Sequence, residues 1–153
     1  MSHPEEKLAE LGLKLPEVAK PVAAYVPVVR TGNLVYTSGQ LPLRNGSLIA
    51  TGKNGDSISA EVGVECAQQC ALNALAAIKS EIGDLANVKR IIKVVAFVAS
   101  SPDFTGQPQV ANGASELLSQ VFEEAGQHAR SAVGVPVLPL DAPVEVEFIV
   151  EVA

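Results

Sequence analysis

The sequence predicts an α+β fold: a two-layer sandwich in which two helices cover one face of a mostly antiparallel sheet. Three observations support this prediction. Runs typical of strands and of helices follow one another in the order strand, strand, helix, strand, helix, strand, strand. The 153 residues suit one domain with a substantial core. Helices of the predicted length can cover only one face of such a sheet, which leaves the other face bare.

A helical extension over residues 1–21 is predicted to precede the main domain at 22–153. Residues 2–12 are typical of a short helix, with Ser2 as the N-cap and Pro4 in the first turn. The prolines that follow indicate a connecting segment.

The main domain is predicted to begin with a hairpin. The β-branched runs Val26–Arg30 and Leu34–Ser38 flank a Thr-Gly-Asn turn. Residues 44–57 are rich in glycine and asparagine, which predicts a loop or one short strand.

Two amphipathic helices are expected next. The first is predicted to begin after Ser59 and to end at Gly83, and the second to span Pro108 to Ala125. The apolar stripe of the first helix comprises Val64, Ala67, Ala71, Leu75, Ile78 and Ile82. Three further β-branched runs predict a central strand and two final strands: Ile91–Ala99, Ser131–Leu138 and Val144–Val152.

The composition indicates self-association. Hydrophobic residues make up 48% of the chain and charged residues only 18%, against about 25% in typical soluble domains. A bare sheet face with so few charges is most simply covered by neighbouring copies of the chain. We therefore expect sheet-to-sheet packing between subunits.

Charge and hydropathy exclude several functional classes. A net charge of −6 argues against non-specific nucleic-acid binding, which depends on neutralising phosphates. The longest uncharged apolar run, Val94–Ala99, is far shorter than the roughly 20 residues of a membrane span. The first ten residues lack a signal-peptide pattern, so a cytoplasmic location is expected.

The residue types present exclude most classes of cofactor site. Cys66 and Cys70 have no nearby histidine or cysteine with which to complete a zinc site, and they are interpreted as buried small residues. The chain has only two histidines, so a Ser-His-Asp triad would depend on His128 alone. No G-x-S-x-G, G-x-G-x-x-G or P-loop motif is present.

Arg130 is the first candidate for a ligand-binding residue. It is the only basic residue after Lys93, and strand alternation places Ala132 and Gly134 on its face, leaving room beside it. A guanidinium is a planar fork that matches a carboxylate. The alternative is that Arg130 pairs with a neighbouring glutamate.

In the last strand, Glu145, Glu147 and Glu151 share the face opposite the valines. Such a row is ordinarily solvated. If one glutamate met Arg130 in a cleft, the pair could hold a carboxylate and orient a water molecule. Tyr25, Ser38 and Asn112 are either ordinary polar residues or parts of that cleft.

Four segments together resemble the Rid (YjgF-like) family of reactive-intermediate deaminases, also labelled endoribonuclease L-PSP. They are A-Y-V at 24–26, G-N-L-V-Y-T-S-G-Q-L-P at 32–42, A-R-S at 129–131 and V-E-V-E at 144–147. The resemblance covers about residues 22–153 and is strongest in the order and spacing of these segments.

The resemblance implies a chorismate-mutase-like fold and a homotrimer with clefts between subunits. It also implies hydrolysis of enamines and imines of the 2-aminoacrylate type to 2-keto acids and ammonia, without a metal or organic cofactor. Three other classes stay open. One is a trimer that binds a small carboxylate without turnover, the second is an endoribonuclease, against which the acidic charge argues, and the third is a purely structural trimer, which would need no Arg130.

Site residues follow from the same resemblance. Arg130 corresponds to the arginine that binds the substrate carboxylate, and Glu145 to the glutamate that positions water. Tyr25, Ser38 and Asn112 correspond to residues that line the cleft. Ala132 stands where well-studied members have a cysteine, and His128 replaces the proline of P-A-R-S, so the chain resembles a divergent branch with an altered pocket.

Overall fold

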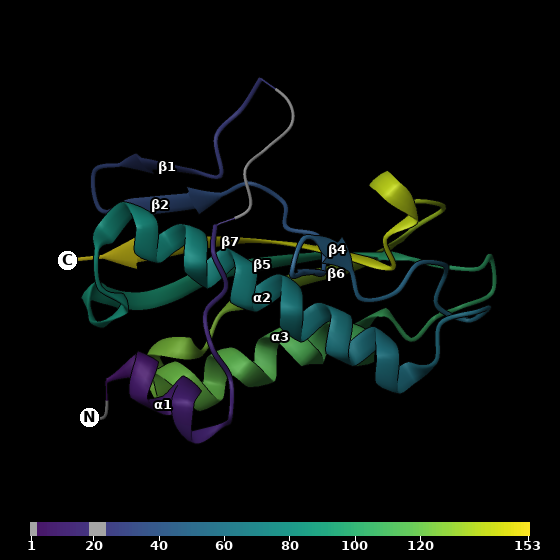
Figure 1. Ribbon diagram of the computed structural model, residues 1–153, viewed down its shortest axis with the longest axis horizontal. Helices are drawn as coiled ribbons and strands as arrows, with labels where there is room; N and C mark the ends of the chain where they lie inside the picture. The colour runs from purple at the N-terminus through teal and green to yellow at the C-terminus, as the bar shows by residue number, and fades with distance from the viewer. Residues whose placement is uncertain (1–2, 19–23) are drawn as a thin grey trace.

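A five-stranded sheet forms one layer of the protein (Figure 1). The computed structural model describes residues 3–18 and 24–153. Across the sheet the strand order is β1-β2-β7-β5-β6. The strands are β1 (Val28–Thr31), β2 (Leu34–Thr37), β5 (Val88–Ala99), β6 (Ala129–Val135) and β7 (Val144–Val152). Only β5 and β6 run parallel, so the sheet is mixed and mostly antiparallel.

Helices α2 (Ala60–Ile82) and α3 (Gln107–Phe122) lie side by side on one face of the sheet, as predicted (Figure 1). Helix α2 begins where expected, because the Ser59 side chain accepts a hydrogen bond from the Val62 N–H. Helix α3 ends earlier than predicted and is followed by a 3₁₀ turn, η2 (Glu123–Gly126).

The strands differ from the prediction in two places. The region predicted as a loop or one short strand holds a small hairpin of β3 (Leu43–Arg44) and β4 (Ser47–Leu48). Strand β6 stops just before Pro136, which has no N–H to give to a sheet.

The core lies between the sheet and the two helices. Val144, Val146, Phe148, Val150 and Val152 alternate along β7 and all point into it. Cys66 and Cys70 on α2 are free and completely buried, as predicted, and burial raises the pKa of the Cys66 thiol to about 11.

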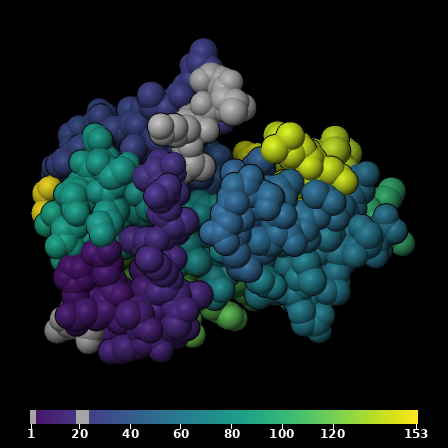
Figure 2. Space-filling model, in the orientation of Figure 1, coloured from purple at the N-terminus to yellow at the C-terminus, as the bar shows by residue number. Residues whose placement is uncertain are grey.

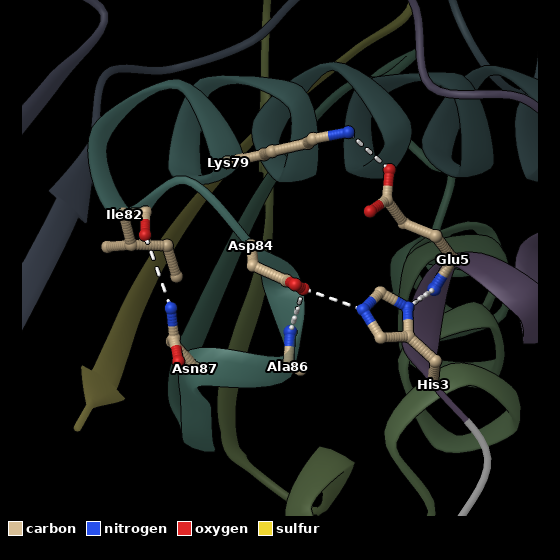
Figure 3. A network of polar contacts seen from close by, with 7 residues as sticks. All are labelled: His3, Glu5, Lys79, Ile82, Asp84, Ala86 and Asn87. Atoms are coloured by element: carbon tan, nitrogen blue, oxygen red, sulfur yellow. Dashed lines mark hydrogen bonds and ion pairs between the residues drawn. The ribbon is translucent and has the colours of Figure 1, made fainter.

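The N-terminal helix α1 (Pro4–Glu10) packs against this body through buried Leu8. Its N-cap is His3, whose Nδ1 accepts a hydrogen bond from the Glu5 N–H at 3.2 Å, while Nε2 contacts Asp84 at 2.7 Å (Figure 3). The predicted cap, Ser2, lies outside the described residues. Glu5 also pairs with Lys79 of α2 at 2.5 Å. The extension therefore shares the core of the main domain.

The second face of the sheet is covered by no helix of the described residues (Figure 1). Val29, Tyr36 and Val133 are each more than two-fifths exposed on the strands that form it. The part of the chain that the structure describes contains no helix long and apolar enough to cross a membrane.

Candidate active site

Arg130 lies on the helix-covered side of β6, the edge strand of the sheet. The parallel register places it beside buried Val94, and Ala132 beside buried Ala96. From there the guanidinium reaches α3, where Nη1 donates to Asn112 Oδ1 at 2.8 Å and to Ser115 Oγ at 3.1 Å. We call Asn112, Ser115, Arg130 and Ala132 the Arg130 cluster.

The partners of Arg130 are neutral. Among residues 3–18 and 24–153, no acidic side chain lies within ion-pair distance of its guanidinium. A half-buried cation held by two neutral acceptors keeps its charge available to an anion. Within the described chain, the alternative in which Arg130 simply pairs with a neighbouring glutamate has no support.

Ser115 is a contact that the sequence analysis missed. It lies three residues after Asn112, a spacing that puts both on one face of a helix. Its Oγ is also 2.9 Å from Nε2 of His128, whose Nδ1 is 2.6 Å from the Gly126 carbonyl oxygen. The helical spacing from Asn112 was the signal that could have identified it.

On the face of β6 that carries Arg130, the space is limited at Gly134. A Cβ at Gly134 would lie 2.7 Å from Gln107 Nε2 and 3.2 Å from Ser100 Oγ. The two small residues therefore have different roles. Gly134 leaves room for Gln107 at the start of α3, while half-buried Ala132 lies next to the arginine on the strand.

Glu145 leaves the sheet on the opposite face. It pairs with Phe97 of β5, whereas its neighbour Val146 pairs with Ala96 on the helix side. Its carboxylate lies against Gly39, in the space that a Cβ at position 39 would occupy. We call Ser38, Gly39 and Glu145 the Glu145 cluster.

Backbone hydrogen bonds hold the two parts of this cluster together. The Gln40 N–H donates to the Val146 carbonyl at 2.8 Å, and the Val146 N–H donates back at 3.0 Å. The segment that follows β2 therefore lies alongside the start of β7, and this brings Gly39 against the Glu145 side chain.

Two influences raise the pKa of the Glu145 carboxyl above its ordinary value. Burial is the larger, and the negative charge of Glu147 two residues on adds to it. Both disfavour the carboxylate, so Glu145 is a better proton acceptor than an exposed glutamate.

The Ser38 side chain is bound to the short segment that contains Tyr25. The Ser38 hydroxyl donates to the Val26 carbonyl at 2.5 Å, which ties the segment before β1 to the end of β2. Tyr25 is 55% exposed. The structure thus brings Asn112 to Arg130 and places Ser38 next to Gly39, but it brings neither Tyr25 nor Ser38 to Arg130.

Within one chain the two clusters do not meet, because Arg130 and Glu145 leave opposite faces of the sheet. A hollow with a volume of about 910 Å³ lies elsewhere, between residues 12–18, the β3–β4 hairpin and α2 (Figure 2). Neither Arg130 nor Glu145 lines it.

One group of side chains has the composition of a metal site. Ligand atoms of His3, Glu5 and Asp84 lie within 4.8 Å of one another. Each of them already has a partner, and the Lys79 ammonium stands at the Glu5 carboxylate (Figure 3). The group is therefore accounted for as the anchor of α1.

Comparison with known proteins identifies relatives along nearly the whole chain. A family model described as "YjgF/chorismate mutase-like, putative endoribonuclease" matches residues 5–152. Protein TCP17 of Trypanosoma cruzi is 47% identical over 145 residues, 94% of this chain and 91% of its own length. A 2-iminobutanoate/2-iminopropanoate deaminase of Dermatophagoides farinae is 29% identical over 138 residues, 90% of this chain and 93% of its own length.

Solved structures share the fold. A protein of unknown function from Agrobacterium tumefaciens is 44% identical and superimposes with a TM-score of 0.93, covering 98% of this chain and 92% of its own. The family match starts inside helix α1, so the match includes most of the N-terminal extension. The chain belongs to the YjgF/chorismate mutase-like family.

Proposed function

We propose that this protein hydrolyses reactive imines and enamines that carry a carboxylate, releasing a 2-keto acid and ammonia. The observation that carries the proposal is the state of Arg130: half-buried, fixed by two neutral acceptors, and without an acidic partner in the described residues. The name of the Dermatophagoides farinae relative supports the reaction type.

Arg130 binds the carboxylate. Its Nη1 is engaged by Asn112 and Ser115, while Nε and Nη2 have no hydrogen-bond partner among the described residues. These two nitrogens form one edge of the guanidinium, and such an edge donates two parallel hydrogen bonds to a carboxylate. The substrate is thereby fixed in one orientation.

Glu145 activates water. An imine carbon is already electrophilic, so the reaction needs a fixed substrate and a delivered hydroxyl. Glu145 takes a proton from water as the oxygen adds to the imine carbon and passes it to the imine nitrogen, which gives a carbinolamine. It then takes the hydroxyl proton of the carbinolamine and passes it to the same nitrogen as the C–N bond breaks, so that the C=O bond forms and ammonia leaves. The overall change is C=N plus water to C=O plus ammonia, and positioning supplies most of the acceleration.

The cleft forms between two copies of the chain. Because Arg130 and Glu145 leave opposite faces of one sheet, we propose that the Arg130 cluster of one subunit faces the Glu145 cluster of the next. A repeated head-to-tail contact of this kind closes into a ring, and a homotrimer is the proposed ring. The uncovered sheet face, which exposes Val29, Tyr36 and Val133, provides the packing surface. Light scattering tests this, and a monomeric mass would overturn it.

A trimer that binds a small carboxylate without turnover is the second candidate, because Arg130 alone would suffice for it. The family description also names an endoribonuclease, but the net charge of −6 disfavours an RNA-binding surface. A cytoplasmic location stays a prediction.

The experiment is a hydrolysis assay with freshly generated 2-iminopropionate, in which ammonia release is followed with and without the protein. We expect a faster release with the wild-type chain. A rate equal to that of buffer, together with binding of a stable 2-keto acid, would leave the binding function in place of the enzyme.

A further inference from the structure

We infer that Ser115 and His128 form a hydrogen-bonded support that positions the Arg130 guanidinium for carboxylate binding. The inference rests on the proposed function, in which Arg130 binds the substrate carboxylate. It adds two positioning residues that act on the substrate only through Arg130.

The direction of donation along these hydrogen bonds is set by the Gly126 carbonyl. A carbonyl oxygen can only accept, so His128 Nδ1 must carry the proton that it shares with Gly126 at 2.6 Å. In the neutral imidazole Nε2 is then an acceptor. The Ser115 hydroxyl, 2.9 Å away, donates to it.

This assignment determines what Ser115 offers to Arg130. With its single proton directed to His128, the Ser115 oxygen presents a lone pair to the Arg130 Nη1–H at 3.1 Å. Asn112 Oδ1 accepts from the same nitrogen at 2.8 Å. Two acceptors on one Nη fix the rotation of the guanidinium plane, because each has its own direction.

Fixing the plane matters for the free edge of the guanidinium. Bidentate binding requires Nε and Nη2 to lie in the plane of the incoming carboxylate, and an arginine free to rotate would lose that alignment. Without His128 the Ser115 hydroxyl could rotate and point its proton at Arg130, turning an acceptor into a competing donor. The support thus pre-orders the side chain before the substrate arrives.

All three supporting side chains lie within regular secondary structure or next to it. Asn112 and Ser115 lie on one face of α3, and His128 lies two residues after Gly126, where the 3₁₀ turn ends. His128 also immediately precedes β6, two residues before Arg130. A short local segment therefore couples the turn to the strand that carries the arginine.

The test is a double-mutant cycle between Ser115→Ala and Arg130→Lys, with Ser119→Ala as the matched control. Ser119 lies one turn further along α3 and is exposed. We expect Ser115→Ala to raise KM for the imine, and Kd for a stable 2-keto acid, about tenfold, with a smaller change in kcat. Ser119→Ala should change neither constant.

The cycle separates positioning from a general structural role. If Ser115 acts through Arg130, Ser115→Ala should add almost nothing in the Arg130→Lys background. An equal cost in both backgrounds would overturn the inference. His128→Ala should show the same dependence on Arg130 with a smaller effect.

A second readout does not depend on turnover. The ¹⁵N–¹H signals of the Arg130 guanidinium, assigned with Arg130→Lys among the four arginines of the chain, should show slow rotation in the wild type and faster rotation in Ser115→Ala. Unchanged rotation would contradict the inference even in an active enzyme. If the wild type neither hydrolyses imines nor binds keto acids, the proposed function fails, and the NMR result alone decides whether the support exists.

Discussion

The two clusters of the proposed cleft are built in opposite ways. In the Arg130 cluster a permanent charge is surrounded by neutral hydrogen-bond acceptors, which leave the charge intact and fix its direction. In the Glu145 cluster the titratable carboxyl group packs against Gly39, and burial raises its pKa. Under the proposed function, carboxylate binding and proton transfer therefore belong to opposite faces of the sheet, with the binding group fixed by hydrogen bonds and the proton acceptor made more basic by burial.

Removing the base should have the largest effect. Glu145→Gln keeps the shape of the side chain but cannot take a proton from water, so we expect imine hydrolysis to fall by about 10²-fold or more. Binding of a stable 2-keto acid should change little, because Arg130 is untouched. Loss of binding with unchanged turnover would exchange the roles of the two clusters.

Arg130→Lys should lower imine hydrolysis at least about tenfold in a normally folded oligomer. Lysine keeps the charge but offers a point donor instead of a fork, and a displacement of about 1 Å can cost roughly a hundredfold in rate. The loss should appear chiefly as weaker substrate binding. Near wild-type kinetics would make Arg130 a structural residue.

Gly39→Ala tests the close approach in the Glu145 cluster. A methyl group at position 39 would occupy the space of the Glu145 carboxylate, which sits at the end of a flexible side chain and can move aside. We expect little loss of stability, because no backbone must shift, but an activity several-fold lower, on the order of 3–10-fold. Gly46→Ala is not a suitable control, since Gly46 has a φ of +86°, where a side chain would be strained.

A suitable control for Gly39→Ala is Ser47→Ala, an exposed position on β4 away from both clusters. Its activity should equal that of the wild type. Equal losses in the two variants would show that the effect does not come from the Glu145 carboxylate.

The smallest effect concerns stability and pH. Since the folded state raises the pKa of Glu145 above its ordinary 4.5, the ionised form is disfavoured on folding. Glu145→Gln should therefore be slightly more stable at neutral pH, by about 1–3 °C in Tm. The advantage should vanish as pH falls through the raised pKa towards the ordinary one, because both side chains are then neutral. Thermal melts from pH 4 to 8 measure it.

Most of the architecture could be predicted from the sequence because its signals are local. The Ser59 cap and the terminating Gly83 defined α2, and alternation along 144–152 defined β7. The end of α3 was misplaced because the Glu123–Gly126 turn continues its apolar pattern in a tighter helix. The β3–β4 hairpin was missed because its strands have two residues each.

The candidate site was less accessible to sequence reasoning. Strand period placed Arg130 and Ala132 on one face and Glu145 away from the valines, as the structure has them. Residue spacing alone does not tell whether Arg130 on β6 and Glu145 on β7 lie on the same face of the sheet or on opposite faces. The answer depends on how β5, which lies between them, pairs with β6, and this pairing is parallel. The contact of Ser115 with His128 depends on a turn whose geometry the sequence does not specify.

The central claim is that each catalytic cleft combines Arg130 of one subunit with Glu145 of another. Co-expression of Arg130→Lys and Glu145→Gln chains, purified as mixed oligomers through two different tags, tests it directly. A cleft that draws its arginine from the Glu145→Gln chain and its glutamate from the Arg130→Lys chain is intact. Every mixed trimer, whichever chain it holds two copies of, has one intact cleft out of three, so we expect about a third of wild-type activity. Activity no greater than that of the two parents would contradict the account.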